Sequence, residues 1–134
     1  MNIRKLKESD YETLKEWWTK YSWPPIEKDF LPENGTGGLI VETKEGEPIV
    51  AGFLYMTNSK AVLLEWIISN FKFKDRKIRK EALLMLVQTI TSLAGSLGKK
   101  YVYSLLKSKS LIDIFQEIGY LKGDSNTQEM IKKL

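Results

Sequence analysis

The sequence predicts one α/β (α+β) domain in which helices flank a mixed, mostly antiparallel central sheet. Its 134 residues suffice for one hydrophobic core but not for a second domain of ordinary size, so residues 1–134 are expected to fold as a unit. Three strand patterns follow one another between residues 39 and 69, and a long helical pattern then separates two apolar strands. A strand, helix and strand in one sheet imply a parallel pair, which makes the predicted sheet mixed.

The first third of the chain is predicted to form a strand followed by helices. Residues 2–6 alternate like a short strand, and Ser9 and Glu12 have the spacing of a capping box that opens a helix. This helix ends before the Pro24-Pro25 pair, because proline cannot continue a helix. Residues 26–31 are expected to form a short second helix, and a glycine-rich turn follows.

The middle of the chain contains the meander and the longest helix. Residues 39–43, 49–57 and 61–69 are predicted to be antiparallel strands, of which the third is the most apolar. Apolar residues then recur at helical spacing from residue 78 to residue 97. Gly98 suits the C-terminal cap of that helix.

The last third is predicted to form a strand, a helix and a hairpin. Residues 101–106 are expected to be a buried strand, and residues 110–118 a helix that ends at Gly119. Residues 120–122 and 129–134 are expected to be the two arms of a closing hairpin. No internal repeat or linker interrupts this order.

The chain contains neither cysteine nor histidine. Disulfides, a thiolate nucleophile, zinc bound by cysteine and the commonest general base are therefore excluded, and with them hydrolases of the Ser-His and Cys-His types. Catalysis would rely on carboxylates, hydroxyls, lysines or backbone amides, and no metal site is expected. The net charge of +4 and the pI near 9.2 indicate affinity for phosphates or other anions without requiring nucleic acid.

Two features bear on location. Residues 1–7 lack the apolar core of a signal peptide, so a cytoplasmic protein is expected. The longest apolar runs, residues 61–64 and 82–87, are far shorter than the roughly 20 residues that span a bilayer, so membrane insertion is not expected.

A basic turn, residues 72–80, joins the most apolar strand to the longest helix. Cations near a helix N-terminus oppose the helix dipole, whereas a bound anion there would be stabilised by the cations and by free backbone amides. The alternative is a solvated surface loop, because runs of charge commonly lie in solvent. Six cations lie within the turn: Lys72, Lys74, Arg76, Lys77, Arg79 and Lys80.

The order of elements resembles the GNAT (acyl-CoA N-acyltransferase) superfamily over nearly the full chain. The most specific local match is residues 111–120, which resemble the C-terminal helix of that family and its closing Phe-Tyr-x-Lys-x-Gly-Phe type segment. Phe115, Gly119 and Tyr120 match or nearly match it. The resemblance implies an acyl-CoA N-acyltransferase-like fold and acetyl-CoA as cosubstrate.

The resemblance also implies where acetyl-CoA binds. The backbone of residues 67–70 would pair with the pantetheine arm, and amides of residues 77–82 would hold the pyrophosphate. The family turn carries glycines that let the backbone approach phosphates, and this turn contains none, although added lysines and arginines can contact phosphates directly. The residues implied in cofactor binding are Ile67, Ile68, Asn70, Lys77, Ile78, Arg79, Lys80, Glu81, Ala82 and Ser110.

Direct acyl transfer to an amine needs a group that takes the amine proton, and Glu65 is the best candidate. It interrupts the apolar run 61–68, on the strand where several relatives carry a glutamate. A carboxylate in a dry site can act as a base if burial raises its pKa. The alternative is a carboxylate that is solvated or paired with a lysine.

Many relatives protonate the departing thiolate with the tyrosine of the Phe-Tyr pair, but here Gln116 follows Phe115. Tyr120 is the first candidate to replace that acid, with Tyr103 and Ser110 as further candidates. The tyrosines are equally compatible with core positions, and Ser110 with a helix cap. Trp17, Trp18 and Trp23 fall where the resemblance puts acceptor-binding helices, and either line an acceptor pocket or pack in the core.

These observations predict an acetyl-CoA-dependent N-acetyltransferase that acts by direct transfer to an amine. The amine, a small molecule or a protein, is not identified, and formation of a homodimer is left open. One alternative is a non-catalytic binding module of the same fold, with or without coenzyme A. Another is nucleic-acid binding through residues 72–80, for which no recognisable motif is present.

Overall fold

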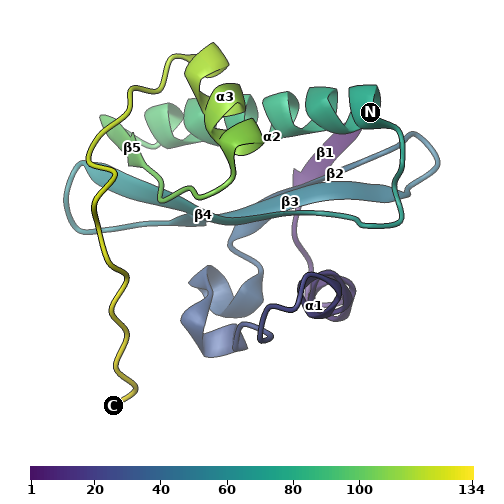
Figure 1. The fold of residues 1–134 in the computed structure, drawn as a ribbon, viewed down its shortest axis with the longest axis horizontal. Helices are drawn as coiled ribbons and strands as arrows, with labels where there is room; N and C mark the ends of the chain where they lie inside the picture. The colour runs from purple at the N-terminus through teal and green to yellow at the C-terminus, as the bar shows by residue number, and fades with distance from the viewer.

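The computed structural model describes all of residues 1–134 and places them in one five-stranded sheet with helices on both faces (Figure 1). The strands lie in the sheet in the same order as in the chain. Neighbouring strands are antiparallel, except for the last two, which are parallel. The predicted mixed, mostly antiparallel sheet is therefore confirmed. The strands are β1 (Asn2–Lys5), β2 (Gly38–Glu42), β3 (Pro48–Tyr55), β4 (Ala61–Ser69) and β5 (Tyr101–Tyr103).

The helices divide between the two faces of the sheet (Figure 1). Helices α2 (Arg76–Ser96) and α3 (Lys109–Ile118) cover one face, and their apolar stripes form a core with the inward residues of β2, β3 and β4. Helix α1 (Asp10–Lys20) lies on the other face with two short 3-10 helices, η1 (Lys28–Phe30) and η2 (Pro32–Gly35). A second core fills the space between them and the sheet. We call these the α2 face and the α1 face.

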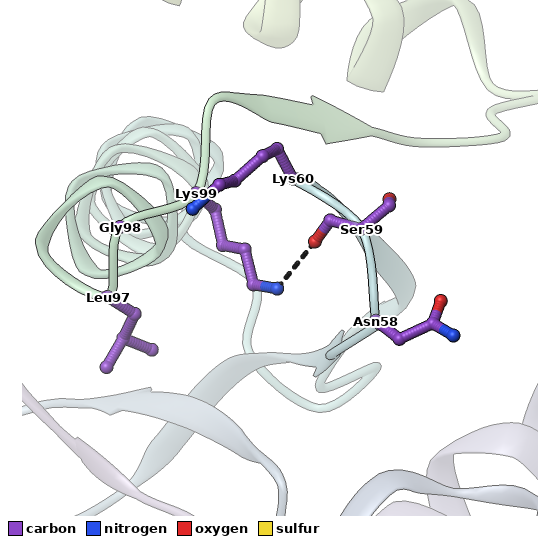
Figure 2. A pocket seen from close by; sticks show the side chains of 6 residues that line it. All are labelled: Asn58, Ser59, Lys60, Leu97, Gly98 and Lys99. Atoms are coloured by element: carbon purple, nitrogen blue, oxygen red, sulfur yellow. Dashed lines mark hydrogen bonds between the residues drawn. The ribbon is translucent and has the colours of Figure 1, made fainter.

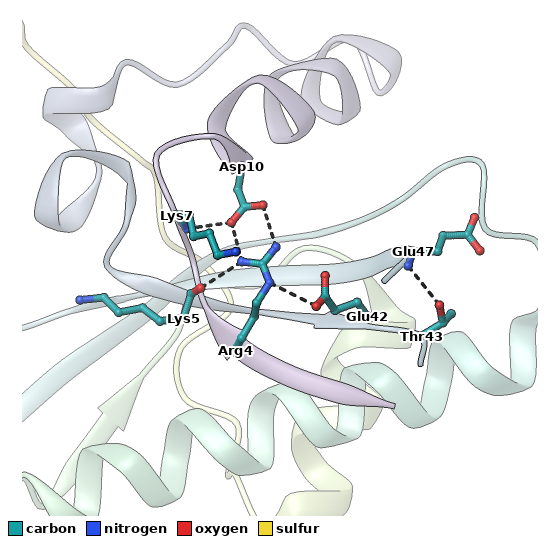
Figure 3. A network of polar contacts seen from close by, with 7 residues as sticks. All are labelled: Arg4, Lys5, Lys7, Asp10, Glu42, Thr43 and Glu47. Atoms are coloured by element: carbon teal, nitrogen blue, oxygen red, sulfur yellow. Dashed lines mark hydrogen bonds and ion pairs between the residues drawn. The ribbon is translucent and has the colours of Figure 1, made fainter. Parts of the chain in front are cut away.

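An ion-pair network ties the start of α1 to the sheet (Figure 3). Arg4 donates to both carboxylate oxygens of Asp10, at 2.8 and 2.9 Å, and to Glu42 at 3.2 Å. The Lys7 backbone N–H donates to Asp10 at 2.7 Å. Burial alone would raise the pKa of Asp10, but these bonds and the Arg4 charge outweigh it and hold the pKa below its usual value.

The predicted capping box at the start of α1 is wrong. Ser9 stands at the N-cap position, but its backbone is already helical, with φ −65° and ψ −20°, and its side chain makes no capping hydrogen bond. A capping hydroxyl reaches the free amides only from an extended backbone. Asp10, one residue later, provides the anchoring carboxylate instead.

Helix α2 begins at Arg76, two residues earlier than predicted. Asp75 is extended at the N-cap, and its carboxylate accepts the Ile78 N–H at 3.1 Å. Aspartate is among the best N-cap residues, and its negative charge also complements the helix dipole. This cap was not predicted, because six cations dominate the sequence of the turn.

The C-terminal part differs most from expectation. Strand β5 ends at Tyr103 and lies at the sheet edge, so Tyr101 and Tyr103 are 66% and 57% exposed rather than buried. Residues 120–134 contain no strand, and the predicted hairpin is therefore wrong. The side chains of Leu121 and Met130 are 94% and 85% exposed, so the two predicted arms lack the buried face that a marginal hairpin needs.

No helix of the structure combines the length and the hydropathy required to cross a membrane.

Candidate functional site

A β-bulge in the middle of β4 brings Glu65 and Trp66 to the same face of the sheet. Glu65 pairs with Phe53 of β3, and the register shifts before the pair of Ala51 and Ile68. Phe53, Ala51 and Ile68 all belong to the α1-face core, against which Trp66 also packs. Trp66 has a φ of +58°, which a bulky side chain rarely adopts. The extra residue thus reverses the usual alternation of neighbours along a strand.

Strands β4 and β5 separate immediately beside Glu65. Their pairing covers only residues 61–63 of β4. Beyond it, the Ser104 hydroxyl donates to the Leu64 carbonyl at 2.5 Å, and the Leu105 N–H donates to Oε1 of Glu65 at 2.8 Å. Residues 65–69 of β4 therefore have no strand partner on the side facing away from β3, and this free edge leaves backbone groups for a ligand.

The environment of Glu65 suits a general base. Burial raises the pKa of Glu65 to about 7, and the nearby negative charge of Glu129 adds to this effect, while the hydrogen bond from Leu105 opposes it. A base works best when its pKa lies close to the operating pH. The predicted candidate thus has suitable protonation chemistry as well as a suitable place.

The start of α2 has fewer free backbone amides than we expected from the sequence. The Arg79 N–H bonds to the Asp75 carbonyl, so the amides of residues 79–82 belong to the helix. The Ile78 N–H is bound to the Asp75 side chain. The amides of Arg76 and Lys77 are the ones left at the helix N-terminus, and Ala82 is fully buried against the sheet.

Two of the six cations of the basic turn are neutralised by carboxylates. Lys72 pairs with Glu16 at 2.8 Å, and Lys80 pairs with Glu117 at 3.2 Å. The Arg79 guanidinium donates to the Phe73 carbonyl at 2.9 Å. The remaining three have exposed side chains and no carboxylate partner: Lys74, Arg76 and Lys77. This part of the turn is open to an anion.

The other predicted cofactor residues on and after β4 have structural contacts of their own. Ile67 packs toward the α2 face, whereas Ile68 is buried in the α1-face core. Asn70 is buried, and its side chain donates to the Pro48 carbonyl at 2.8 Å and accepts the Lys72 N–H at 3.0 Å. Asn70 therefore shapes the turn that leads to α2.

Tyr120 is not brought together with Glu65. Its ring packs on Phe115, with centroids 4.7 Å apart, and its hydroxyl lies 2.5 Å from the hydroxyl of Thr91 on α2. These contacts belong to the α2 face, whereas Glu65 is on the α1 face. Burial raises the pKa of Tyr120 above its ordinary value, and the hydrogen bond with Thr91 opposes this rise. The geometry favours a packing role.

Ser110 is exposed near the start of α3. Its hydroxyl lies 2.9 Å from that of Ser108. Ser108 is the N-cap residue, accepting the Leu111 N–H at 3.4 Å. The helix is therefore capped by Ser108, two residues before the expected Ser110.

The aromatic residues near Glu65 are not those the sequence analysis put first. Trp17 and Trp18 are fully buried in the α1-face core, so the packing alternative holds for them. Trp23 is partly exposed and lies edge-on to Trp66, with ring centroids 6.5 Å apart. Phe30 and Trp66 were not predicted as site residues. Trp66 was not predicted because the alternation of a regular strand would put it on the opposite face from Glu65.

A surface pocket of about 240 Å³ lies elsewhere, where the β3–β4 turn meets the end of α2 (Figure 2). The Lys99 ammonium crosses it and donates to the carbonyls of Ser59 and Thr57, at 2.7 and 2.9 Å. These bonds join the turn to the helix end. The Lys99 side chain in this pocket therefore has a structural role. No group of three or more metal-ligating side chains occurs in the structure.

No family model and no curated protein sequence matches the chain. Solved structures do match it over their full fold. TTHA1254 from Thermus thermophilus has a TM-score of 0.69 and 18% identity, covering 100% of this chain and 99% of that one. Glucosamine-6-phosphate N-acetyltransferase from Arabidopsis thaliana has a TM-score of 0.68 and 15% identity, covering 98% of each chain.

A further match contains coenzyme A. Rv2747 from Mycobacterium tuberculosis, in complex with CoA, has a TM-score of 0.64 and 15% identity, covering 88% of this chain and 81% of that one. Identities this low establish a shared fold and leave activity aside. The element order and the separation of β4 from β5 are consistent with these likenesses. The chain therefore has the fold of the GNAT acetyltransferases, in a divergent form.

Proposed function

We propose that this protein is an N-acetyltransferase that moves an acetyl group from acetyl-CoA directly to an amine. The observation that carries the proposal is the position of Glu65, a half-buried carboxylate with a raised pKa on the β4 bulge, beside the opening between β4 and β5.

The chain fits acetyl-CoA in two places. The free edge of residues 65–69 can pair with the amide groups of the pantetheine arm, as one strand pairs with another. The exposed side chains of Lys74, Arg76 and Lys77, with the free amides at the start of α2, can hold the phosphates. Asp75 already occupies one helix amide, so the side chains carry more of the phosphate contact than in a glycine-rich turn.

The reaction requires one proton acceptor at the amine. Glu65 in its ionised form takes the proton from the amine nitrogen, which attacks the thioester carbon. A C–N bond forms, the C–S bond breaks, and the CoA thiolate leaves with the bonding electrons. Because the Tyr120 hydroxyl is paired with Thr91 and Gln116 replaces the usual tyrosine, we propose that water protonates the thiolate and that the resulting hydroxide takes the proton from Glu65, which returns the carboxylate to its ionised form.

Binding and turnover test the proposal separately. With a dissociation constant near 10 μM, acetyl-CoA at 1 mM would raise Tm by roughly 5–10 °C, since it binds only the folded state. Thiol release in the presence of a panel of amines then reports transfer. A protein that binds acetyl-CoA but transfers it to no amine would instead be a binding module, and one that shows no Tm shift would contradict the proposal.

A matched pair of variants tests the role of Glu65. The change Glu65→Gln keeps an oxygen that can accept the Leu105 N–H but cannot take a proton, so kcat should fall by about 10²–10⁴-fold while the Kd for acetyl-CoA stays unchanged. The control is Glu45→Gln, an exposed carboxylate in the turn between β2 and β3, which should leave both values as they are.

A further inference from the structure

Three aromatic side chains beside Glu65 form a partly exposed cluster on the α1 face, and we call Trp23, Phe30 and Trp66 the aromatic cluster. Phe30 and Trp66 lie edge-to-face with ring centroids 6.0 Å apart, and Trp23 and Trp66 with centroids 6.5 Å apart. The three come from the segment after α1, from η1 and from β4. Separate parts of the chain therefore converge on the bulge.

The cluster exposes more aromatic surface than folding needs. Phe30 is 48% exposed and Trp23 is 38% exposed, whereas Trp17 and Trp18 already fill the core beneath α1. Large aromatic side chains gain most by burial, and grouped exposed ones mark binding surfaces. Packing of α1 does not explain why these two rings face outward.

Hydrogen bonds hold the cluster in one arrangement. The Trp66 indole N–H donates to the Tyr55 hydroxyl at 2.7 Å, and that hydroxyl donates to the Phe30 carbonyl at 2.9 Å. Trp66 also keeps an unfavourable positive φ, a kind of strain that concentrates at functional sites. Without that bulge, Trp66 would lie on the α2 face, away from Glu65.

We infer that the aromatic cluster binds the acceptor, and that the acceptor is a small primary amine carrying an aromatic or large apolar group. This inference rests on the proposed function. An aromatic group packs edge-on or offset against the exposed rings, and its ammonium is attracted by the ring faces and by the Glu65 carboxylate on the same face. The arrangement thus directs the amine toward the base.

The polar groups of the cluster argue against a sugar or another polyhydroxylated amine. The Trp66 N–H and the neighbouring Tyr55 hydroxyl are already bonded to one another and to the Phe30 carbonyl, which leaves the Trp23 N–H as the one polar side-chain group of the cluster open to a ligand. A sugar would lose its water on this surface without gaining matching hydrogen bonds, which costs binding energy. An apolar substituent meets no such penalty.

Acceptor specificity tests the inference. Initial rates with acetyl-CoA would be compared for 2-phenylethylamine, spermidine and glucosamine. We expect kcat/KM for 2-phenylethylamine to exceed that for each of the others by at least tenfold. A larger kcat/KM for spermidine or glucosamine would overturn the inference while leaving the proposed acetyltransferase activity intact.

The variant Phe30→Ala removes a ring but keeps the backbone carbonyl that anchors Tyr55. Because Phe30 is half exposed, the variant should fold, which its Tm verifies. We expect KM for 2-phenylethylamine to rise at least fivefold while KM for acetyl-CoA stays unchanged. The matched control is Tyr101→Ala, another exposed aromatic residue, on β5. An unchanged KM for the amine in Phe30→Ala would contradict the inference.

If no amine is acetylated, the proposed function fails and direct binding decides the inference. Calorimetry with 2-phenylethylamine would then show binding that is weakened at least fivefold in Phe30→Ala and unchanged in Tyr101→Ala. Absence of binding to the wild-type protein at millimolar concentration would overturn the inference as well.

Discussion

In the mechanism that we propose, Glu65 connects catalysis and stability through its raised pKa of about 7. The unfolded chain would ionise this carboxyl near its ordinary pKa. The folded state is therefore favoured most below that ordinary pKa, where Glu65 is protonated in both states. This advantage is lost as pH rises through about 7, because the folded state must then hold the buried carboxylate in its charged form. The same burial that would prepare Glu65 as a base therefore weakens the folded state at alkaline pH.

A pair of unfolding curves measures this cost. We expect Glu65→Gln to gain stability relative to wild type as pH rises from about 5 to 8, because glutamine does not ionise. Chemical denaturation at several pH values gives the difference directly. A difference that stays constant across this range would mean that the pKa of Glu65 is not raised in the folded protein.

Asp10 shows the opposite dependence, because its pKa is lowered in the folded protein. Its contribution is present above the ordinary pKa of an aspartate and is lost as pH falls through the lower, folded value. Replacing it with asparagine breaks the ion pair with Arg4 at 2.8 Å and should cost about 1–3 kcal/mol at pH 7.

Urea denaturation of Asp10→Asn at pH 7 and at pH 3 checks this prediction. The loss of stability should shrink at the lower pH, where the wild-type carboxyl begins to be protonated. Glu12→Gln, an exposed carboxylate in the first turn of α1, serves as the control and should change little. An equal loss at both pH values would show that the network contributes through packing instead of charge.

At the scale of elements, the start of α2 combines a favourable cap with an unfavourable charge for phosphate binding. Asp75 satisfies the Ile78 amide, yet its carboxylate would repel a pyrophosphate at the same helix end. The three unpaired cations nearby, Lys74, Arg76 and Lys77, offset that repulsion. If acetyl-CoA binds as we propose, its affinity depends on a balance of charges within four residues.

The variant Asp75→Ser tests that balance. Serine caps a helix about as well as aspartate, so stability should change by less than about 0.5 kcal/mol. Loss of the negative charge should tighten binding of coenzyme A by roughly two- to fivefold, measured by calorimetry at low salt. The control Asp124→Ser removes another exposed aspartate that accepts a backbone N–H, outside any helix. Weaker binding in Asp75→Ser would contradict a phosphate site there.

Sequence patterns predicted the elements where burial and periodicity agree. Strand β4 was predicted with its actual bounds, because one apolar run fills it, and α3 ends as expected at Gly119, which adopts a φ of +106°. Glu65 was identified because a charge interrupts that apolar run. The part played by Trp66 could not be predicted, since a single bulge reverses which face a residue occupies and no local pattern signals it.

At the scale of the whole molecule, the order of elements was more informative than the residues of the turn. The order, together with the local match of residues 111–120, predicted the fold that the solved structures share. The closing hairpin was predicted over residues 120–122 and 129–134, but a strand is firmly specified only when one of its faces is buried against a core. Side chains such as Leu121 find no such core here.

The fold also explains how one small core can hold a reactive carboxylate. Two apolar layers secure the sheet from both sides, and the irregular features, namely the bulge and the short β4–β5 pairing, coincide at Glu65. Departures from regular structure at one place, within otherwise consistent packing, are typical of functional sites. These two irregular features of β4 lie where we propose the chemistry.

The pH dependence of kcat, measured with saturating acetyl-CoA and saturating amine, tests this account most directly. We expect kcat to rise with pH through an apparent pKa of about 7, as Glu65 loses its proton, and then to reach a plateau. In Glu65→Gln, kcat should be strongly reduced at every pH, without that transition. Activity that persists in the variant with the same rise near pH 7 would show that Glu65 is not the base.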